Sequence, residues 1–109
     1  EGASLNRPPM FEGEHFSFWK NRMKIFIQSN DPSAWNAMEK GSVFPLKNVG
    51  NDMIPKEWDE MTDVEKRVVQ YDFKAKNVIT FALSSNEFFR IVRCKSAKEM
   101  WEMLEITHE

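Results

Sequence analysis

The sequence is poor in cysteine and in long apolar runs, and both absences narrow the class of protein. Cys94 is the only cysteine, which excludes an intrachain disulfide and a multi-cysteine zinc site. The chain has no Asn-x-Ser/Thr glycosylation acceptor and no recognisable signal peptide. Its apolar runs fall far short of the ~20 residues that cross a bilayer. The sequence therefore predicts a cytoplasmic protein without a membrane partner.

The chain also lacks an excess of positive charge, and histidine is scarce. The formal net charge is −2 at pH 7, whereas nucleic-acid-binding domains usually carry an excess of Lys and Arg. The two histidines, His15 and His108, lie near opposite ends of the chain, and neither accompanies a nucleophile or oxyanion motif. We expect both to be surface residues at helix ends. The protein is predicted not to be an enzyme and to have no cofactor, metal or small-molecule substrate.

The apolar content, by contrast, is sufficient for one hydrophobic core. Hydrophobic residues make up 41% of the 109 residues and aromatic residues 13%, and a chain of this length can bury most of its apolar surface in one domain. Residues 1–10 are polar and contain Pro8-Pro9, which favours an extended segment. We expect a single helical domain over residues 11–109, truncated at its C-terminal side.

The longest predicted helix covers residues 62–85. Thr62 and Glu65 are spaced as a capping box, in which each side chain accepts a hydrogen bond from the other residue's backbone N–H. Apolar residues then recur at steps of three and four: Val64, Val68, Tyr71, Ala75, Val78, Ile79 and Ala82. Val69 and Phe73 lie off this stripe and Phe81 lies on the opposite flank, so more than one side of the helix requires apolar cover.

Shorter helices are predicted before and after it. The first covers residues 14–29, with a core stripe of Phe16, Trp19, Met23, Phe26 and Ile27. Asp31-Pro32 begins a second helix, which Gly41 ends. Ser85 caps a third, and Ser96 with Glu99 forms a capping box for a fourth. The fold class is therefore all-α, a small bundle of about five helices around one long central helix.

The stretch 41–61 is predicted to be an ordered loop held down by Phe44, Leu46, Ile54 and Trp58. A hairpin there is the weaker alternative because the apolar alternation is poor. The four tryptophans fall in four different segments, and large rings of this kind usually fix segments to a common core. We expect the core anchors to be Trp19, Trp35, Trp58 and Trp101, with at least three of them buried.

Phe18 and Ile25 form a second, narrower apolar line on the first helix, with Arg22 between this line and the core stripe. Two interpretations are open. The favoured one is that the line packs into more core. The other is that Phe18, Arg22 and Ile25 form an outward surface for another chain, and these three residues are our candidate assembly surface.

Few other residues suggest chemistry. Cys94 lies between two basic residues, which would lower a thiol pKa, but a half-buried structural cysteine is the favoured interpretation. The carboxylates around residues 57–65 suit a helix N-terminus better than a metal site. Asp72 is explained by an ordinary pair with Lys76. A candidate basic contact patch, which could touch RNA or an acidic partner, consists of Arg90, Arg93, Lys95 and Lys98.

Two separated segments resemble those of copia-type LTR retrotransposon Gag polypeptides of plants. Residues 11–23, FEGEHFSFWKNRM, resemble the family's F-x-G-x-x-[FY]-x-x-W-[KR]-x-R-M pattern, which follows a proline pair such as Pro8-Pro9. Residues 96–104, SAKEMWEML, resemble its [ST]-A-K-E-x-W-x-x-L pattern, and residues 106–109, ITHE, resemble the start of a V/I-T-H-E-G ending. Trp35 and Gly41 also lie where the family places these residues.

The resemblance implies a structural Gag protein. Its helical domain, similar to a capsid N-terminal domain, would self-associate as a homo-oligomer into a virus-like particle around element RNA, without catalysis. The zinc knuckle that grips RNA in many relatives has no counterpart in this chain, so RNA contact would come from regions outside it. The alternative function is that of a domesticated Gag-like module inside a host protein, where it would bind a peptide or another protein partner.

Overall fold

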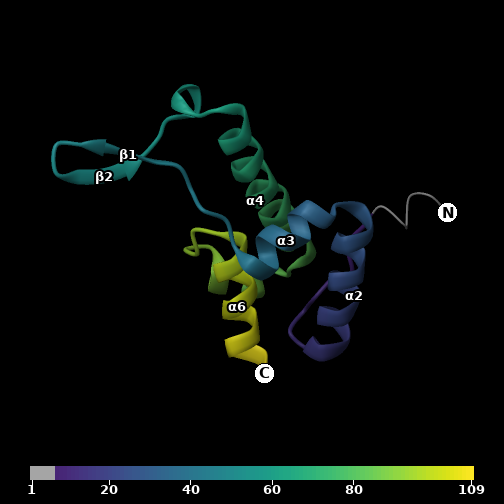
Figure 1. Ribbon diagram of the computed structural model, residues 1–109. Helices are drawn as coiled ribbons and strands as arrows, with labels where there is room; N and C mark the ends of the chain where they lie inside the picture. Colours follow the sequence, from purple (N-terminus) through teal and green to yellow (C-terminus); the bar gives the residue numbers. More distant parts are fainter. Residues whose placement is uncertain (1–6) are drawn as a thin grey trace.

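The computed structural model describes residues 7–109 and contains five α-helices, one short 3₁₀ helix and one two-stranded sheet (Figure 1). In chain order these elements are α2 (Phe16–Asn30), α3 (Pro32–Lys40), β1 (Leu46–Val49), β2 (Asp52–Pro55), η1 (Trp58–Glu60), α4 (Asp63–Ala82), α5 (Ser85–Ile91) and α6 (Ala97–His108). The predicted all-α class with about five helices is confirmed. Most of the predicted extended segment 1–10 lies outside the described residues.

The longest helix is α4, and its first turn forms as the sequence predicts. Thr62 is the N-cap, and the capping box with Glu65 is complete in both directions. The 20 residues of α4 give it a length of about 30 Å. It packs against α3 and α6. Its buried side is rotated from the predicted stripe, because Val69 and Asp72 are buried while Val64 is exposed.

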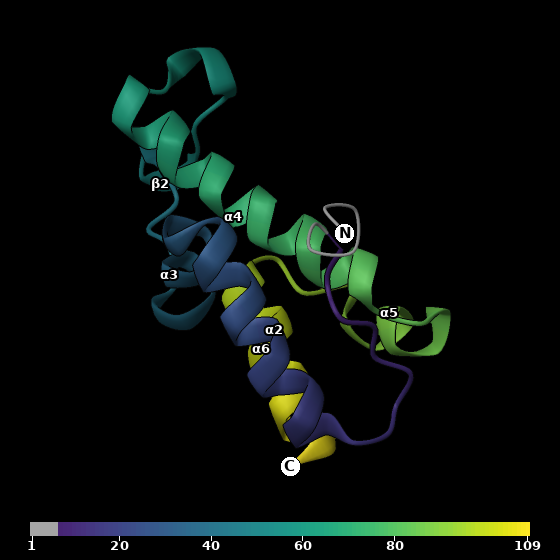
Figure 2. The same ribbon diagram turned by 90° about the vertical axis from the view of Figure 1, so that its right-hand side faces the viewer.

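The core lies where α2, α3, α4 and α6 meet. Three tryptophans occupy it: the rings of Trp19 and Trp101 lie 5.7 Å apart, and that of Trp35 meets Trp101 edge-on at 5.6 Å. Figure 2 shows α2 in front of α6, and the first of these ring contacts joins the two helices. Large buried rings in contact contribute more than their burial alone.

The N-terminal segment is tied to the end of α4 through Phe11. Its side chain is buried, its N–H donates to the Ala82 carbonyl at 2.8 Å, and its carbonyl accepts from the Ser84 N–H at 3.0 Å. These bonds form an isolated bridge between Phe11 and Leu83, and both side chains are buried. The bridge also fixes the direction in which α2 begins.

The prediction of an ordered loop over residues 41–61 is wrong, because this stretch contains an antiparallel hairpin. Leu46 pairs with Pro55 and Val49 with Asp52, so Gly50 and Asn51 form a two-residue turn. Gly50 has a φ of +62°, as the first position of a type II′ turn requires. The Gly-Asn pair was the signal that could have identified the hairpin.

The hairpin projects from the helical body (Figure 1). Neither strand packs extensively against a helix, and each strand contacts mainly its partner. The molecule measures 49 × 30 × 21 Å with a radius of gyration of 15.4 Å, against about 13 Å for a compact domain of this length. The side chains of Leu46 and Ile54, expected to hold the loop down, are exposed.

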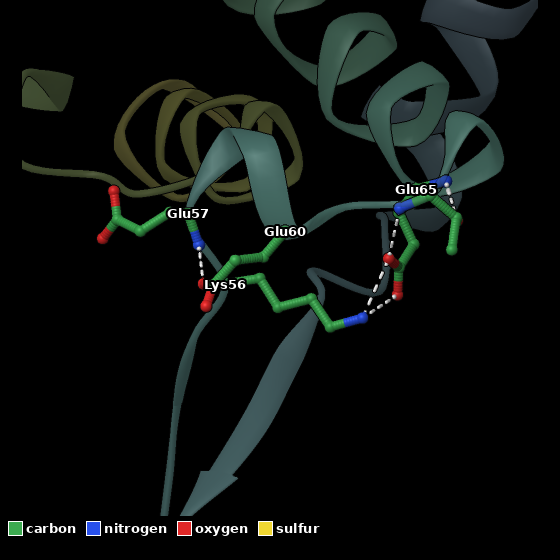
Figure 3. A network of polar contacts seen from close by, with 5 residues as sticks. Lys56, Glu57, Glu60 and Glu65 are labelled. Carbon is green, nitrogen blue, oxygen red and sulfur yellow. Dashed lines mark hydrogen bonds and ion pairs between the residues drawn. The ribbon is translucent and has the colours of Figure 1, made fainter.

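Polar contacts hold the base of the hairpin (Figure 3). The Lys56 ammonium lies 3.0 Å from the Glu65 carboxylate on α4, and the Glu57 N–H donates to Glu60 at 2.8 Å. Lys47 on β1 pairs with Glu60. Trp58 lies in this region with 47% of its surface exposed. Its assignment as a core anchor is therefore wrong, because η1 stands away from the helices that bury the other three tryptophans.

Candidate assembly surface

The outward face of α2 carries the exposed apolar line noted in the sequence. Trp19, Met23 and Ile27 turn into the core, so helical pitch directs Phe18 and Ile25 away from it. Both are 65% exposed. The favoured interpretation of these two residues as additional core is wrong, since no other element within residues 7–109 covers this side of α2.

Arg22 belongs to the same face. Its guanidinium carbon lies 5.4 Å from the centre of the Phe18 ring, within the range of a cation–π contact. Phe18, Arg22 and Ile25 thus form a surface with an apolar part and one positive charge, all on a single helix. Such a surface can bind an apolar side chain with a carboxylate beside it.

The position of α2 is fixed at its first turn. His15, the N-cap, is exposed as predicted and adopts a left-handed conformation with φ of +59°. One turn later, the Trp19 indole N–H donates to the Pro9 carbonyl at 2.8 Å. Together with the Phe11 bridge, these contacts hold the exposed face of α2 on a rigid support.

Other large apolar side chains are exposed on the rest of the helical body. The least covered aromatic ring is that of Phe81 on α4, at 72% exposed, and Phe73 and Phe89 are exposed as well. The sequence indicated that Phe73 and Phe81 require cover on more than one side of their helix. Within residues 7–109 the chain provides none for them.

The four members of the candidate basic patch are not equivalent. Arg90, Arg93 and Lys95 are exposed near the connection between α5 and α6. Lys98 instead pairs with Glu102 on its own helix, and its side chain lies against Gly41. Within this patch, the positive charge available to a partner is therefore limited to three residues.

The predicted surface position of His108 is wrong. Its ring stacks on Phe16 at 5.3 Å and meets Phe11 edge-on at 4.9 Å, and its Nε2 lies 2.7 Å from Oε1 of the buried Glu87. This contact joins the last turn of α6 to α5. The sequence provided no pattern that pairs two residues so far apart.

Asp72 has a larger role than the predicted pair with Lys76. It is only 1% exposed, and its Oδ1 accepts a hydrogen bond from the Ala97 N–H at 3.0 Å. The carboxylate thus satisfies one of the orphan donors at the N-terminus of α6. The Lys76 ammonium lies 3.3 Å from Oδ2, although within residues 7–109 that oxygen accepts no hydrogen bond. Asp72 therefore joins α4 to α6.

The remaining candidates for chemistry have structural partners. Burial and the nearby Glu99 carboxylate raise the pKa of the Cys94 thiol, opposite to the effect expected from its basic neighbours. Acidic residues within the stretch 57–65 take part in helix caps and ion pairs. Among residues 7–109, no three His, Cys, Asp or Glu side chains are grouped so that they could hold a metal ion.

Comparison with known proteins returns no relative: no family model, no curated protein and no solved structure matches this chain. Over residues 7–109, none of the helices has the length and apolar character needed to cross a membrane.

Proposed function

We propose that this chain is a Gag capsid-type domain that mediates self-assembly into a retrotransposon particle. The observation that carries the proposal is the exposed line of Phe18 and Ile25 on α2. Phe18 lies within one of the two segments that resemble copia-type Gag polypeptides, and Ile25 lies two residues beyond the end of that segment. The other segment contains Trp101, which contacts Trp19 in the core.

Assembly of a closed or helical particle requires contacts that are weak individually and strong in number. Small exposed apolar surfaces on a rigid helical body are suited to such contacts. Phe18 and Ile25 offer one on α2, and Phe73, Phe81 and Phe89 offer others on α4 and α5. Several separate surfaces let one copy contact more than one neighbour, as a particle demands.

RNA would then be packaged mainly by regions outside this chain. Arg90, Arg93 and Lys95 are exposed, but the net charge of −2 provides little attraction for a polyanion. The domain would act by binding copies of itself.

The test is size-exclusion chromatography with light scattering over a concentration series. We expect the mean mass of the wild-type chain to rise with concentration and Phe18→Asp to remove most of that rise, because a charge on this surface opposes its burial. Ser17→Asp is the matched control, since Ser17 is the exposed neighbour of Phe18 on α2.

A wild-type chain that remains monomeric at every concentration contradicts the proposed function. Equal self-association of Phe18→Asp and wild type contradicts only the assignment of the α2 surface. Circular dichroism of both variants verifies that the helices are retained.

A further inference from the structure

The hairpin is the part of the molecule that contributes least to its own core. All four residues of β2 are exposed, as are three of the four in β1. Neither strand packs extensively on a helix. A two-stranded hairpin is at best marginally stable in water without a further strand or a covering surface, so the hairpin gains most from a contact beyond its own domain.

The hydrogen-bond pattern of the ladder identifies which backbone groups are free for such a contact. The Lys56 N–H donates to the Pro45 carbonyl at 3.0 Å, which makes this pair a hydrogen-bonded position. Hydrogen-bonded and non-hydrogen-bonded positions alternate along an antiparallel pair. Leu46↔Pro55 and Asn48↔Met53 are therefore non-hydrogen-bonded positions. The C=O groups of these four residues, and the N–H groups of all of them except Pro55, point outward, away from the partner strand.

The two edges of the hairpin differ in what they offer. On the β2 edge, one of the outward positions is Pro55, which has no N–H to donate. On the β1 edge, Leu46 and Asn48 both have outward donors and acceptors. Phe44 lies two residues before Leu46, and within residues 7–109 its N–H donates no backbone hydrogen bond. The β1 edge is open over this stretch, whereas proline interrupts the β2 edge.

We propose that the β1 edge pairs antiparallel with the β1 edge of a second copy of the chain, which joins the two hairpins into a four-stranded sheet. This inference rests on the proposed self-assembly function and assigns it a second surface, separate from Phe18 and Ile25. Unpaired edge strands are known templates for pairing between chains.

Charge and side-chain pattern select the register and favour a second copy as the occupant. With the twofold axis at Leu46, Leu46 lies opposite Leu46 of the other copy, Phe44 opposite Asn48, and Lys47 opposite Pro45. No like charges meet in this arrangement. An axis at Lys47 would place two lysines directly opposite each other, which is unfavourable. An axis at Asn48 would place two polar amides at the centre.

The same register also gathers apolar side chains on one face. Residues that alternate along a strand share a face, so Leu46 lies on the same side as Met53 and Pro55 across the ladder. Leu46 and Met53 are about half exposed. Twofold pairing at Leu46 would bring the two Leu46 side chains together at the new seam, whereas Met53 and Pro55 lie on the outer strands and would not contact the other copy. The edge can thus pair with its own copy through backbone hydrogen bonds, with Leu46 against Leu46 and without like charges directly opposite each other.

The decisive variants are Asn48→Pro and Met53→Pro in the full chain, compared by sedimentation velocity. Each substitution removes one backbone N–H that points outward. The two residues face each other across the ladder, so the two backbone changes are matched. We expect Asn48→Pro to weaken self-association at least tenfold, since it removes donors from the open edge. Met53→Pro should leave self-association within about twofold of wild type. Cross-strand contacts between Lys47 and Ile54, observed by NMR, verify that each variant retains the hairpin.

A second test uses the twofold axis itself. Leu46→Asp and Leu46→Lys should each weaken self-association, because the axis would bring like charges together. An equimolar mixture of the two variants should restore it, because the introduced carboxylate of one copy would then face the introduced ammonium of the other. Recovery on mixing is specific to pairing of this residue with itself and does not follow from general destabilisation.

When the wild type self-associates, three results overturn the proposal: undiminished self-association of Asn48→Pro, equal losses in both proline variants, or no recovery in the mixture. If the wild type associates and Asn48→Pro associates equally, assembly stands and uses other surfaces, such as that of Phe18. If the wild type is monomeric throughout while the hairpin remains ordered, the proposed function and this inference both fail. The occupant of the edge would then be a different polypeptide.

Discussion

The helical body and the hairpin are built on opposite principles. In the body, each helix buries one face against others, and the tryptophan rings of α2, α3 and α6 meet in the core. In the hairpin, a two-residue turn and a short ladder provide the order, and the side chains stay exposed. The body is stabilised by burial, whereas the hairpin depends on its turn and on ion pairs at its base. The two regions should therefore respond differently to the same kind of change.

The largest expected contrast is between two tryptophans. Trp101→Ala should lower the free energy of unfolding by about 3–5 kcal/mol, because it leaves a cavity in the core. Trp58→Ala should lower it by less than about 1 kcal/mol, since Trp58 is half-exposed and contacts the Lys66 ammonium at 5.3 Å. Urea unfolding monitored by circular dichroism measures both. Similar losses in the two variants would mean that η1 belongs to the cooperative core.

A smaller contrast concerns charged groups in the two regions. Asp72→Ala should cost about 2–3 kcal/mol, because the buried Ala97 N–H loses its charged acceptor. Asp72→Asn should cost less, because an amide oxygen can still accept that hydrogen bond. The comparison at the hairpin base is Glu60→Gln, which should leave global stability unchanged within error, since exposed ion pairs contribute little. Equal effects of Asp72→Ala and Asp72→Asn would show that the charge matters more than the hydrogen bond.

The smallest expected effect is a pH dependence confined to the hairpin base. The hydrogen bond from Lys47 lowers the pKa of Glu60, and that from the Thr62 backbone N–H lowers the pKa of Glu65. Each carboxylate has a folded-state pKa below its unfolded value. Its contribution to stability is therefore complete above the unfolded pKa and is lost as the pH falls through the folded pKa. Acid should thus weaken the contacts that these two carboxylates make at the hairpin base. NMR titration of both carboxyls, in native and urea-unfolded protein, measures the difference. Unchanged midpoints would contradict it.

The two regions also differ in how well the sequence predicts them. The helices carry strong local signals: the Thr62–Glu65 box and the Asp31-Pro32 start both form as expected. The hairpin signal is limited to Gly50-Asn51, and poor alternation around it obscured the strands. Two contacts could not be predicted: that of Asp72 on α4 with the N-terminus of α6, and that of Glu87 with His108. Each joins residues more than 20 positions apart.

The candidate surface was predicted only in part. Helical spacing places Phe18 and Ile25 together on α2, but spacing alone does not decide whether a neighbouring helix covers them. The open edge of β1 could not be predicted from the sequence, since it depends on the register of a hairpin that the sequence suggests only weakly. Local patterns predict elements well. The free surfaces follow from how these elements pack.

The most direct test is hydrogen exchange of the hairpin amides as a function of protein concentration. We predict that the outward amides of Leu46 and Asn48 exchange rapidly in dilute protein and become protected as concentration rises. The amides of α6 should be protected equally at all concentrations, because their hydrogen bonds belong to the helical body. Protection of Leu46 and Asn48 that is independent of concentration would contradict the claim that the hairpin edge binds a second copy.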